Sequence, residues 1–352
     1  MRRCWTGILC LAACVAPLIS ARADAVGDFY NGKTVTLIMS VGEGDGMDKA
    51  ARIIARHWSK HIPGNPNIVV KNMPGAGSLR ATNFLYSQAP KDGTTLGGII
   101  PAFVRQQLLG GTGVDYDAAK FNWLGSSNIS NPTVFVWRTT GVTTLAQART
   151  KELLLGATGA GSNSAHYPTI LNNVLGTKFK IIMGYRASPA INLAIEQGEV
   201  HGRAGQTFNT LVLNHSRWLK EKKVNILVQI GTRKERGFEQ VPLLTDFARD
   251  PAQRDVLRVF SDEIALGRPY LAPPDVPAER VAALRKAFAA TMQDPDFLVD
   301  AKKLRLDVTP TGGDALQKLA AGLTRTHSDV LTRVKAALVL DKSRAGKAKG
   351  GK

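Results

Sequence analysis

The sequence predicts an α/β protein of two lobes, each a mainly parallel sheet flanked by helices. With 352 residues the chain is too long for one ordinary hydrophobic core. Short apolar runs rich in β-branched residues alternate with segments of helical spacing, which is typical of βαβ units. Glycine-rich loops follow predicted strands in both halves of the chain. Because ligands gather at the carboxyl ends of parallel strands, these loops predict binding surfaces in both lobes.

The first lobe opens with a strand, a glycine loop and a helix. Residues 34–40 are apolar and β-branched, and Gly42, Gly44 and Gly46 follow them. Residues 47–58 then place apolar side chains at helical spacing. The backbone amides of such a helix start can bind an anion, although a tight turn without a ligand uses glycine equally well. The other elements predicted for this lobe are strands at 67–71 and 94–100 and helices at 78–89 and 103–109.

The second half of the chain repeats the pattern. Predicted strands lie at 133–137, 153–155, 179–183, 199–203 and 224–230, and predicted helices at 166–174, 188–197 and 207–222. Two further helices are predicted at 277–291 and 314–340. We therefore assign residues 26–126 and 228–340 to lobe one and residues 127–227 to lobe two.

The N-terminus has the features of an export signal. Arg2 and Arg3 precede an apolar segment at 5–19, and small residues near position 25 supply a cleavage site, so residues 1–25 are predicted to be a signal peptide. The alternative is a lipoprotein signal, Leu11-Ala-Ala-Cys14, which would leave a short apolar segment. Either signal exports the protein, and we expect it in the periplasm. All three cysteines lie within this segment, which excludes thiol nucleophiles and cysteine-ligated metals from the mature protein.

The chain is strongly basic, with a formal net charge of +18. Part of the excess comes from residues 341–352, which we predict to be a disordered basic tail. A basic protein suits an anionic small molecule, an acidic membrane surface or nucleic acid. Export, and the lack of a basic stripe interleaved with aromatic residues, argue against nucleic acid.

Common catalytic and cofactor motifs are missing from the sequence. The loop at 42–46 is not the dinucleotide fingerprint, because Met47 and Lys71 occupy positions that need a glycine and an acid. There is no phosphate-binding Walker sequence and no G-x-S-x-G nucleophile motif. His57 and His61 have a spacing that could bind a metal, but no glutamate lies between them, and we interpret both as surface histidines. We expect no cofactor, no metal and no catalytic residue.

The loop at 159–164 is the most specific signal from the residues themselves. It ends a predicted strand, starts a predicted helix, and offers backbone amides, two hydroxyls and an amide side chain. This combination suits the binding of a carboxylate. The alternative is a helix cap without a ligand, for which Ser162 or Ser164 alone would be enough. Three glycine loops spread over two lobes favour an anion site in a cleft between the lobes.

Several segments together resemble the extracytoplasmic solute-binding proteins of tripartite tricarboxylate transporters, the Bug family. They are Gly32-Lys-Thr-Val-Thr-Leu-Ile38 with its glycine loop, Asn72-Met-Pro-Gly-Ala-Gly77, Ala89-Pro-Lys-Asp-Gly93, Gly159-Ala-Gly-Ser162 and Gly198-Glu-Val200. The resemblance covers residues 28–340 in the family's order. It implies a two-lobed Venus-flytrap fold without catalysis. It also implies a small carboxylate ligand, held partly by backbone amides and waters, and delivery to the permease subunits of a tripartite membrane transporter. We expect the protein to act as a monomer.

The resemblance also implies the ligand-binding residues. Carried over by position, they are Gly44, Asp45, Gly46 and Asp48 in the first loop, Gly75, Ala76 and Gly77 in the second, Gly161, Ser162, Asn163 and Ser164 in the second lobe, and Tyr185 after a later strand.

This chain departs from the family pattern at two places. Asp45 stands where the family has glycine, so it could contact an amino or hydroxyl group of the ligand. Arg203 ends the strand predicted at 199–203, where many relatives carry an aspartate, and it is a candidate partner for an anion; a solvated surface arginine is the alternative. Two other functions stay open: a ligand-sensing periplasmic module, and an exported hydrolase that uses Ser162 or His166.

Overall fold

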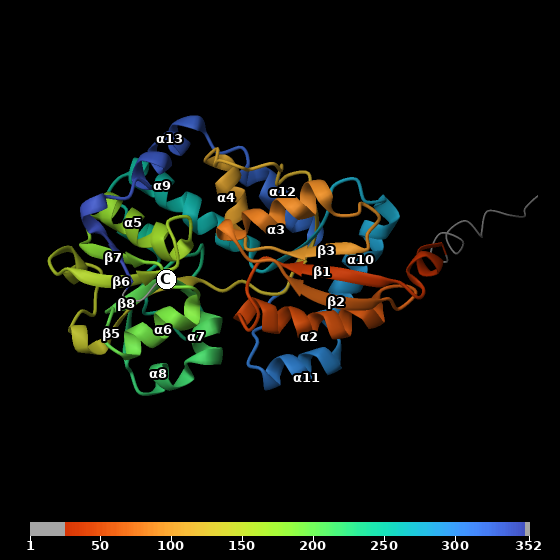
Figure 1. Ribbon diagram of the computed structural model, residues 1–352, viewed down its shortest axis with the longest axis horizontal. Helices are drawn as coiled ribbons and strands as arrows, with labels where there is room; N and C mark the ends of the chain where they lie inside the picture. Colours follow the sequence, from red (N-terminus) through yellow and green to blue (C-terminus); the bar gives the residue numbers. More distant parts are fainter. Residues whose placement is uncertain (1–24, 349–352) are drawn as a thin grey trace, which may run out of the picture.

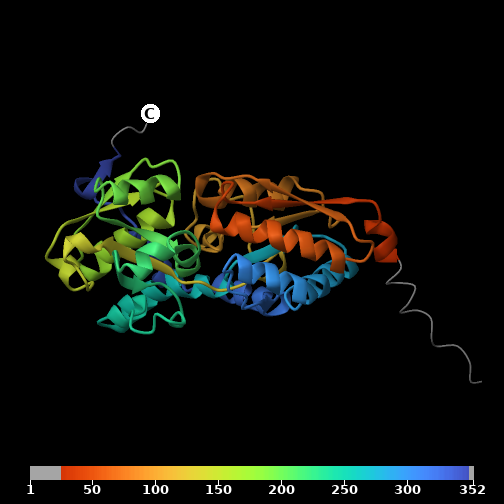
Figure 2. The same cartoon turned by 90° about the horizontal axis from the view of Figure 1, so that it is seen from below.

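Two six-stranded sheets organise residues 25–348, the part of the chain that this computed structural model describes. The sheets lie side by side along the long axis of the molecule, with helices on both faces of each (Figure 1). The first sheet has the spatial order β11-β4-β10-β3-β1-β2, and the second β12-β7-β6-β8-β5-β9. Figure 2 shows the two lobes from below. The predicted two-lobed α/β architecture is confirmed.

The helices and strands have the following bounds. The strands of the first sheet are β1 Thr34–Met39, β2 Asn67–Asn72, β3 Thr95–Gly98, β4 Asn122–Ser126, β10 Pro269–Ala272 and β11 Thr311–Gly312. Those of the second sheet are β5 Pro132–Trp137, β6 Leu153–Ala157, β7 Phe179–Met183, β8 Gly202–Thr207, β9 Val224–Gln229 and β12 Ala345–Lys347. The α-helices are α2 Gly46–His61, α3 Leu79–Asn83, α4 Ala102–Leu108, α5 Asn163–Leu175, α6 Ser188–Glu196, α7 Phe208–Asn214, α8 Ser216–Lys220, α9 Pro251–Asp262, α10 Ala278–Thr291, α11 Pro295–Lys303, α12 Gly313–Leu323 and α13 Ser328–Ala337.

The sheets are mixed rather than mainly parallel. In the first, β1 pairs in parallel with β2 and β3, whereas β10 pairs antiparallel with β3 and β4. In the second, β6 pairs in parallel with β7 and β8, whereas β5 pairs antiparallel with β8 and β9. The antiparallel strands β5 and β10 each come directly after a segment that connects the two lobes. These connecting segments are residues 127–131, before β5, and residues 263–268, before β10.

The chain passes between the lobes more often than the sequence indicated. Helices α9 and α13, predicted for lobe one, contribute Leu257, Phe260 and Val334 to the core of lobe two. Helix α12 contributes Leu316 and Ala320 to the core of lobe one. The single helix predicted at 314–340 is therefore two helices, and the chain crosses between the lobes where α12 ends and α13 begins.

The predicted disordered tail is ordered as far as residue 348. Strand β12 adds to the outer edge of β7 in parallel register, with Ala345 opposite Ile181 and Lys347 opposite Met183. The amide of Ala348 donates to the Met183 carbonyl at 2.8 Å. The predicted signal peptide, with its alternative at Cys14, lies outside the described residues except for residue 25, and residues 349–352 also lie outside them. No helix within residues 25–348 combines the length and the apolar character needed to cross a bilayer.

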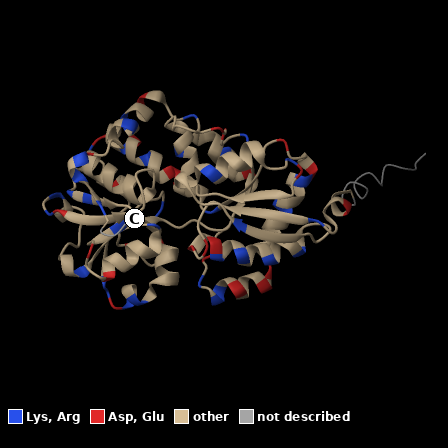
Figure 3. Ribbon diagram, viewed as in Figure 1, with Lys and Arg blue, Asp and Glu red and all other residues tan. Residues whose placement is uncertain are grey.

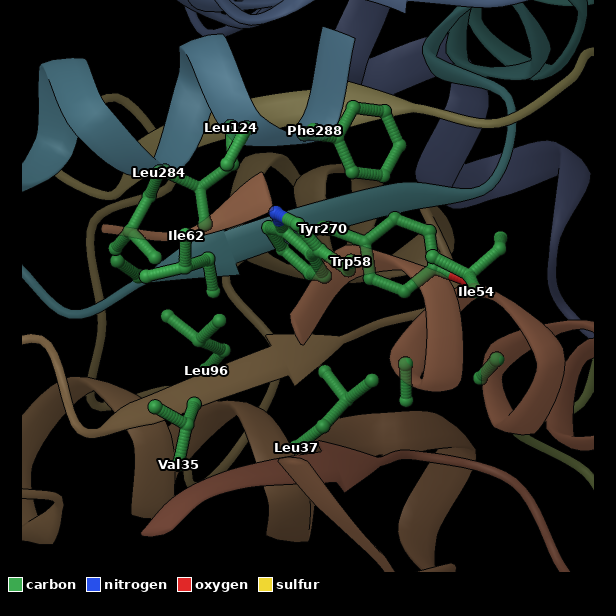
Figure 4. Packing of buried hydrophobic residues seen from close by; sticks show 14 of the residues in the cluster. Val35, Leu37, Ile54, Trp58, Ile62, Leu96, Leu124, Tyr270, Leu284 and Phe288 are labelled. Atoms are coloured by element: carbon green, nitrogen blue, oxygen red, sulfur yellow. The ribbon is translucent and has the colours of Figure 1, made fainter. Parts of the chain in front are cut away.

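A tightly packed core fixes the helix that starts at the first glycine loop. The Trp58 indole of α2 is fully buried, with its ring centroid 5.7 Å from that of Tyr270 and 5.1 Å from that of Phe288. These aromatic rings pack beside Leu37 of β1 and Leu96 of β3 (Figure 4). Burial of such large side chains is strongly stabilising, so α2 is held firmly against the first sheet, and the helix begins near the carboxyl end of β1.

Candidate functional site

A cavity of about 620 Å³ lies between the two lobes. It is lined by the carboxyl-end loops of both sheets and by the connecting segments. The charged residues in its lining are Asp45, Arg186, Arg203, Glu263 and Arg268. Elsewhere the basic residues are scattered over both lobes rather than gathered in one stripe (Figure 3). The cavity has the size and the interlobe position of a small-molecule site.

Of the four residues predicted in the first loop, only Asp45 lines the cavity. Its carboxylate caps α2 by accepting a hydrogen bond from the Met47 amide at 2.8 Å. Asp48 is 1% exposed and serves the loop itself, because it accepts hydrogen bonds from the amide of Gly44 at 2.9 Å and from Asn72 at 2.8 Å. Gly46 places its carbonyl 3.5 Å from Arg268. The loop thus presents one carboxylate to the cavity, since Glu43 is exposed and does not line it.

The second loop lines the cavity with all three predicted residues, Gly75, Ala76 and Gly77. Its backbone is unusual, because Ala76 and Ser78 both have positive φ, at 47° and 85°. Non-glycine residues in this region carry backbone strain, which is common at ligand sites. The buried Ser78 hydroxyl donates to the Ser40 hydroxyl at 3.1 Å, and this bond holds the strained loop against the end of β1.

The second-lobe loop also faces the cavity, with Gly161, Ser162, Asn163 and Ser164 in its lining. The Ser162 hydroxyl donates to the Gly159 carbonyl at 2.7 Å and lies 2.7 Å from the Ser164 hydroxyl. Ser164 in turn accepts from the Thr158 amide at 3.2 Å. The two hydroxyls therefore stabilise the turn that leads into α5. The cavity lies at the N-terminal end of α5, which is the end toward which the first backbone amides of the helix point.

Tyr185 does not line the cavity. Its hydroxyl donates to Glu199 at 2.7 Å, and its ring packs in a core cluster of lobe two. Burial, together with the hydrogen bond to Glu199, raises the pKa of Tyr185. Its neighbour Arg186 is exposed and does line the cavity.

Arg203 is buried rather than solvated, being 3% exposed at the cavity wall. Its guanidinium donates to the Ser188 carbonyl at 3.1 Å, the Ser188 hydroxyl at 3.0 Å and the Asn192 side chain at 3.0 Å. Its Nε has no hydrogen-bond partner among the described residues. Burial lowers the pKa of Arg203 to about 10, although the nearby Asp45 carboxylate opposes this change.

Arg268 is a second buried arginine that sequence analysis did not identify. It is 9% exposed, and the one hydrogen bond of its side chain within residues 25–348 runs to the Gly46 carbonyl at 3.5 Å. Burial lowers the pKa of Arg268, and Asp45 again opposes the change. Within the same residues neither Arg203 nor Arg268 forms an ion pair with a carboxylate. Buried charges are normally paired, so both guanidinium groups are suited to an anion in the cavity.

A third buried arginine, Arg105, is fully partnered. It forms a two-pronged ion pair with Glu263 at 3.0 and 3.1 Å, and it also donates to the Asn163 side chain at 2.7 Å and to His166 Nδ1 at 2.9 Å. Burial works against its charge, yet Glu263 holds the pKa of Arg105 above its ordinary value. Glu263 is thus neutralised, although it lines the cavity.

The geometry gives no support to a hydrolase. The Ser162 hydroxyl is bonded to Gly159 and Ser164, not to a histidine. Burial and the charge of Arg105 lower the pKa of His166 to about 3, which makes it a poor general base at neutral pH.

The two histidines considered as metal ligands instead face acids at the N-cap and inside α11. His57 pairs with Asp300 at 3.1 Å and His61 with Asp294 at 2.9 Å. His57 is 4% exposed, so it is not a surface residue. Within residues 25–348 no group of three or more such side chains is arranged to hold a metal ion.

No protein-family model matches the chain, and no curated protein sequence does. Solved structures do match. A TctC solute-binding protein from Polaromonas has a TM-score of 0.60 and 19% identity, over 86% of this chain and 99% of its own. The periplasmic binding protein BugD has a TM-score of 0.66 and 19% identity, over 91% and 100%. MatC from Rhodopseudomonas palustris with bound malate has a TM-score of 0.63 and 19% identity, over 87% and 99%. The chain therefore has the two-lobed fold of periplasmic solute-binding proteins.

Proposed function

We propose that this protein is an extracytoplasmic solute-binding protein of the Bug type, which captures a small carboxylate ligand in the interlobe cleft. It delivers that ligand to the permease subunits of a tripartite tricarboxylate-type transporter. It works in the periplasm as a monomer and catalyses no reaction.

The observation that carries the proposal is the pair Arg203 and Arg268. Both guanidinium groups are buried in the cavity wall, and neither has a carboxylate partner within the described part of the chain. Keeping a charge buried without a counter-ion costs free energy, and a ligand carboxylate supplies that counter-ion. A guanidinium also matches the planar shape of a carboxylate, because it can donate two parallel hydrogen bonds.

The charges of the lining favour a dicarboxylate. Arg186, Arg203 and Arg268 face the cavity, and Asp45 opposes them, whereas Glu263 is neutralised by Arg105. Two positive charges are left in excess, which suits a ligand with two carboxylates. The neighbour MatC, which has the same fold, holds malate, a compound of this class.

The two arginines come from different parts of the fold. Arg203 lies on β8 of the second lobe, and Arg268 on the segment that leads into β10 of the first sheet. A ligand bound to both would hold the lobes in one relative position. Hinge closure of the lobes around the ligand is therefore the mechanism of capture.

Calorimetric and thermal-shift titration with malate, succinate and adipate tests the proposal. A ligand at 100 times its dissociation constant adds about 2.7 kcal/mol to the free energy of unfolding, and therefore raises Tm. Arg203→Met and Arg268→Met should each weaken binding by about 30-fold or more, since truncating a buried charged contact costs about 2–5 kcal/mol. Arg258, whose side chain is 60% exposed outside the cleft, provides the control Arg258→Met. The proposal fails if no small carboxylate raises Tm, or if both cleft variants bind like the control.

A further inference from the structure

Strand β8 carries a β-bulge at the cavity wall. In the pairing of β8 with β5, Gln206 lies opposite Thr133 and Ala204 opposite Val134, so Gly205 is an extra residue. Its φ is +82°, a backbone conformation that glycine adopts without strain. A bulge shifts the alternation of side chains along a strand, and bulges are frequent beside ligand sites. As a result Arg203 and Gln206 both line the cavity, whereas Ala204 packs in the core of lobe two.

The bulge also fits closely against the second-lobe loop. A Cβ atom at Gly205 would lie 3.2 Å from the Ser164 amide nitrogen and 3.3 Å from the Asn163 carbonyl carbon. The start of α5 and the bulge of β8 are therefore packed as one unit. This packing fixes the position of Gln206 relative to Ser162 and Ser164.

Gln206 has an unsatisfied side chain in this wall. It is 4% exposed, and neither its amide oxygen nor its amide nitrogen has a hydrogen-bond partner among residues 25–348. The Nε of Arg203, on the same strand, also lacks a partner. Each unpaired buried polar group costs about 1–3 kcal/mol in the free energy of folding. These unpaired atoms are therefore suited to hydrogen bonds with polar atoms of a bound ligand.

We propose that Gln206 is a specificity-determining residue that selects ligands with a hydrogen-bond donor on the carbon next to a carboxylate. This inference rests on the proposed carboxylate-binding function. The two amide atoms of Gln206 lie side by side and need an acceptor and a donor that are also adjacent. A 2-hydroxy or 2-amino carboxylate offers that pair, because its carboxylate oxygen accepts from Nε2 while its hydroxyl or ammonium donates to Oε1. Both amide atoms are buried in this structure, so the Gln206 side chain turns toward the cavity when it meets the ligand.

A plain dicarboxylate cannot satisfy the same side chain. Succinate offers acceptors only, so the Gln206 oxygen would stay buried without a donor. One such unmade hydrogen bond corresponds to an affinity difference of about 10- to 100-fold. Asp45 distinguishes the two donor types. The positive charge of a ligand ammonium group would be stabilised by the Asp45 carboxylate, whereas a neutral hydroxyl group needs no such counter-ion.

The test is calorimetric titration of five ligands with the same four-carbon diacid backbone. They are the two enantiomers of malate, aspartate, succinate, and 2-methylsuccinate, which fills the space of a 2-substituent without a donor. The wild-type protein should bind malate or aspartate about 10- to 100-fold more tightly than both succinate and 2-methylsuccinate. In Gln206→Met this preference should fall below about threefold, whereas Gln240→Met, at an exposed position outside the cleft, should keep it.

Each outcome decides something. If the wild-type protein binds all five ligands equally, or if Gln206→Met keeps the preference, the role of Gln206 is wrong and the carboxylate-binding function stands. If neither adipate nor any of the five ligands binds, both the inference and the proposed function fail. The comparison of malate with 2-methylsuccinate uses the wild-type protein alone, so it stays decisive even if Gln206→Met does not fold.

Discussion

The ion pair between Arg105 and Glu263 should be the largest single electrostatic contribution to the stability of this protein. Arg105 belongs to α4 of the first lobe, and Glu263 follows α9 of the second. Their side chains are only 2% and 3% exposed. The same guanidinium bonds Asn163 and His166 of α5, so one side chain joins both lobes and the connecting segment behind the cleft.

Replacing Arg105 by methionine keeps most of the packing and leaves the Glu263 carboxylate buried without a counter-ion. Breaking one side of a buried ion pair costs about 3–5 kcal/mol in the free energy of unfolding. Burial raises the pKa of Glu263 even in the wild-type protein, and more so without Arg105. A carboxyl whose pKa is raised on folding stabilises the protein below its unfolded pKa and loses this contribution as pH rises through the folded value. The loss caused by Arg105→Met should therefore be largest near pH 8 and smaller near pH 4.5.

Urea unfolding at 25 °C and at both pH values measures this loss. Arg105→Met with Glu263→Met removes both charges and should recover much of the stability, since apolar residues can replace a buried ion pair. The exposed pair Arg217 and Glu221 provides the control, because Arg217→Met should leave the unfolding midpoint unchanged. A loss below about 1 kcal/mol in Arg105→Met, or no recovery in the double variant, would refute this reasoning.

Three further predictions concern the acid slope, the bulge and the C-terminal strand. The pKa of His166 is lowered to about 3, so the unfolded chain binds a proton that the folded protein excludes, and stability falls as pH drops below about 6.5. His166→Gln keeps an acceptor for Arg105. Between pH 7 and pH 5 its free energy of unfolding, measured in urea, should fall by about 2 kcal/mol less than that of the wild-type protein; equal decreases contradict this. Gly205→Ala forces a non-glycine residue to φ +82° and should cost about 1–2 kcal/mol and weaken malate binding, whereas Gly312→Ala, in open space, should do neither. Deleting residues 345–352 uncovers the edge of β7 and should produce concentration-dependent self-association in size-exclusion chromatography; a monomer at all concentrations would rule this out.

The elements that the sequence predicted well share a clear local signal. β1 and β9 are runs of apolar and β-branched residues bounded by turn formers, and α2 has its apolar residues at helical spacing. Two of the strands that the sequence did not predict, β4 and β10, are only five and four residues long and do not alternate. Their pairing depends on segments far away in the chain, which no local pattern records.

The C-terminal strand was missed for a different reason. Its residues Ala345, Gly346 and Lys347 have the composition of a disordered tail. The strand nevertheless pairs with β7, because edge pairing uses main-chain hydrogen bonds and asks little of the side chains. Composition describes the cost of burying side chains, not the availability of an open sheet edge.

The binding surfaces were predicted as loops but not as side chains. Asp45, the second loop and the second-lobe loop could be located because glycine-rich turns at strand ends are visible in the sequence. Asp48 and Tyr185 match the family pattern by position, yet their side chains serve the loop and the core. Arg268 carries no sequence signal, since only the folded chain brings it beside Gly46.

Gln206 illustrates the limit of pattern analysis in the same cleft. Regular alternation along β8 would place it on the face of Ala204, in the core. The bulge at Gly205 turns it to the cavity instead, and this bulge depends on the register with β5 and on the contact with α5. A local sequence pattern contains neither of these.

The proposed function depends on where a ligand binds, so the decisive measurement is a crystal structure of the protein grown with malate. We predict that one carboxylate of malate lies within hydrogen-bonding distance of Arg203. Either the same carboxylate or the second one should lie within that distance of Arg268, and both lobes should contact the ligand. An empty cleft at saturating malate, or malate bound away from both guanidinium groups, would contradict the central claim.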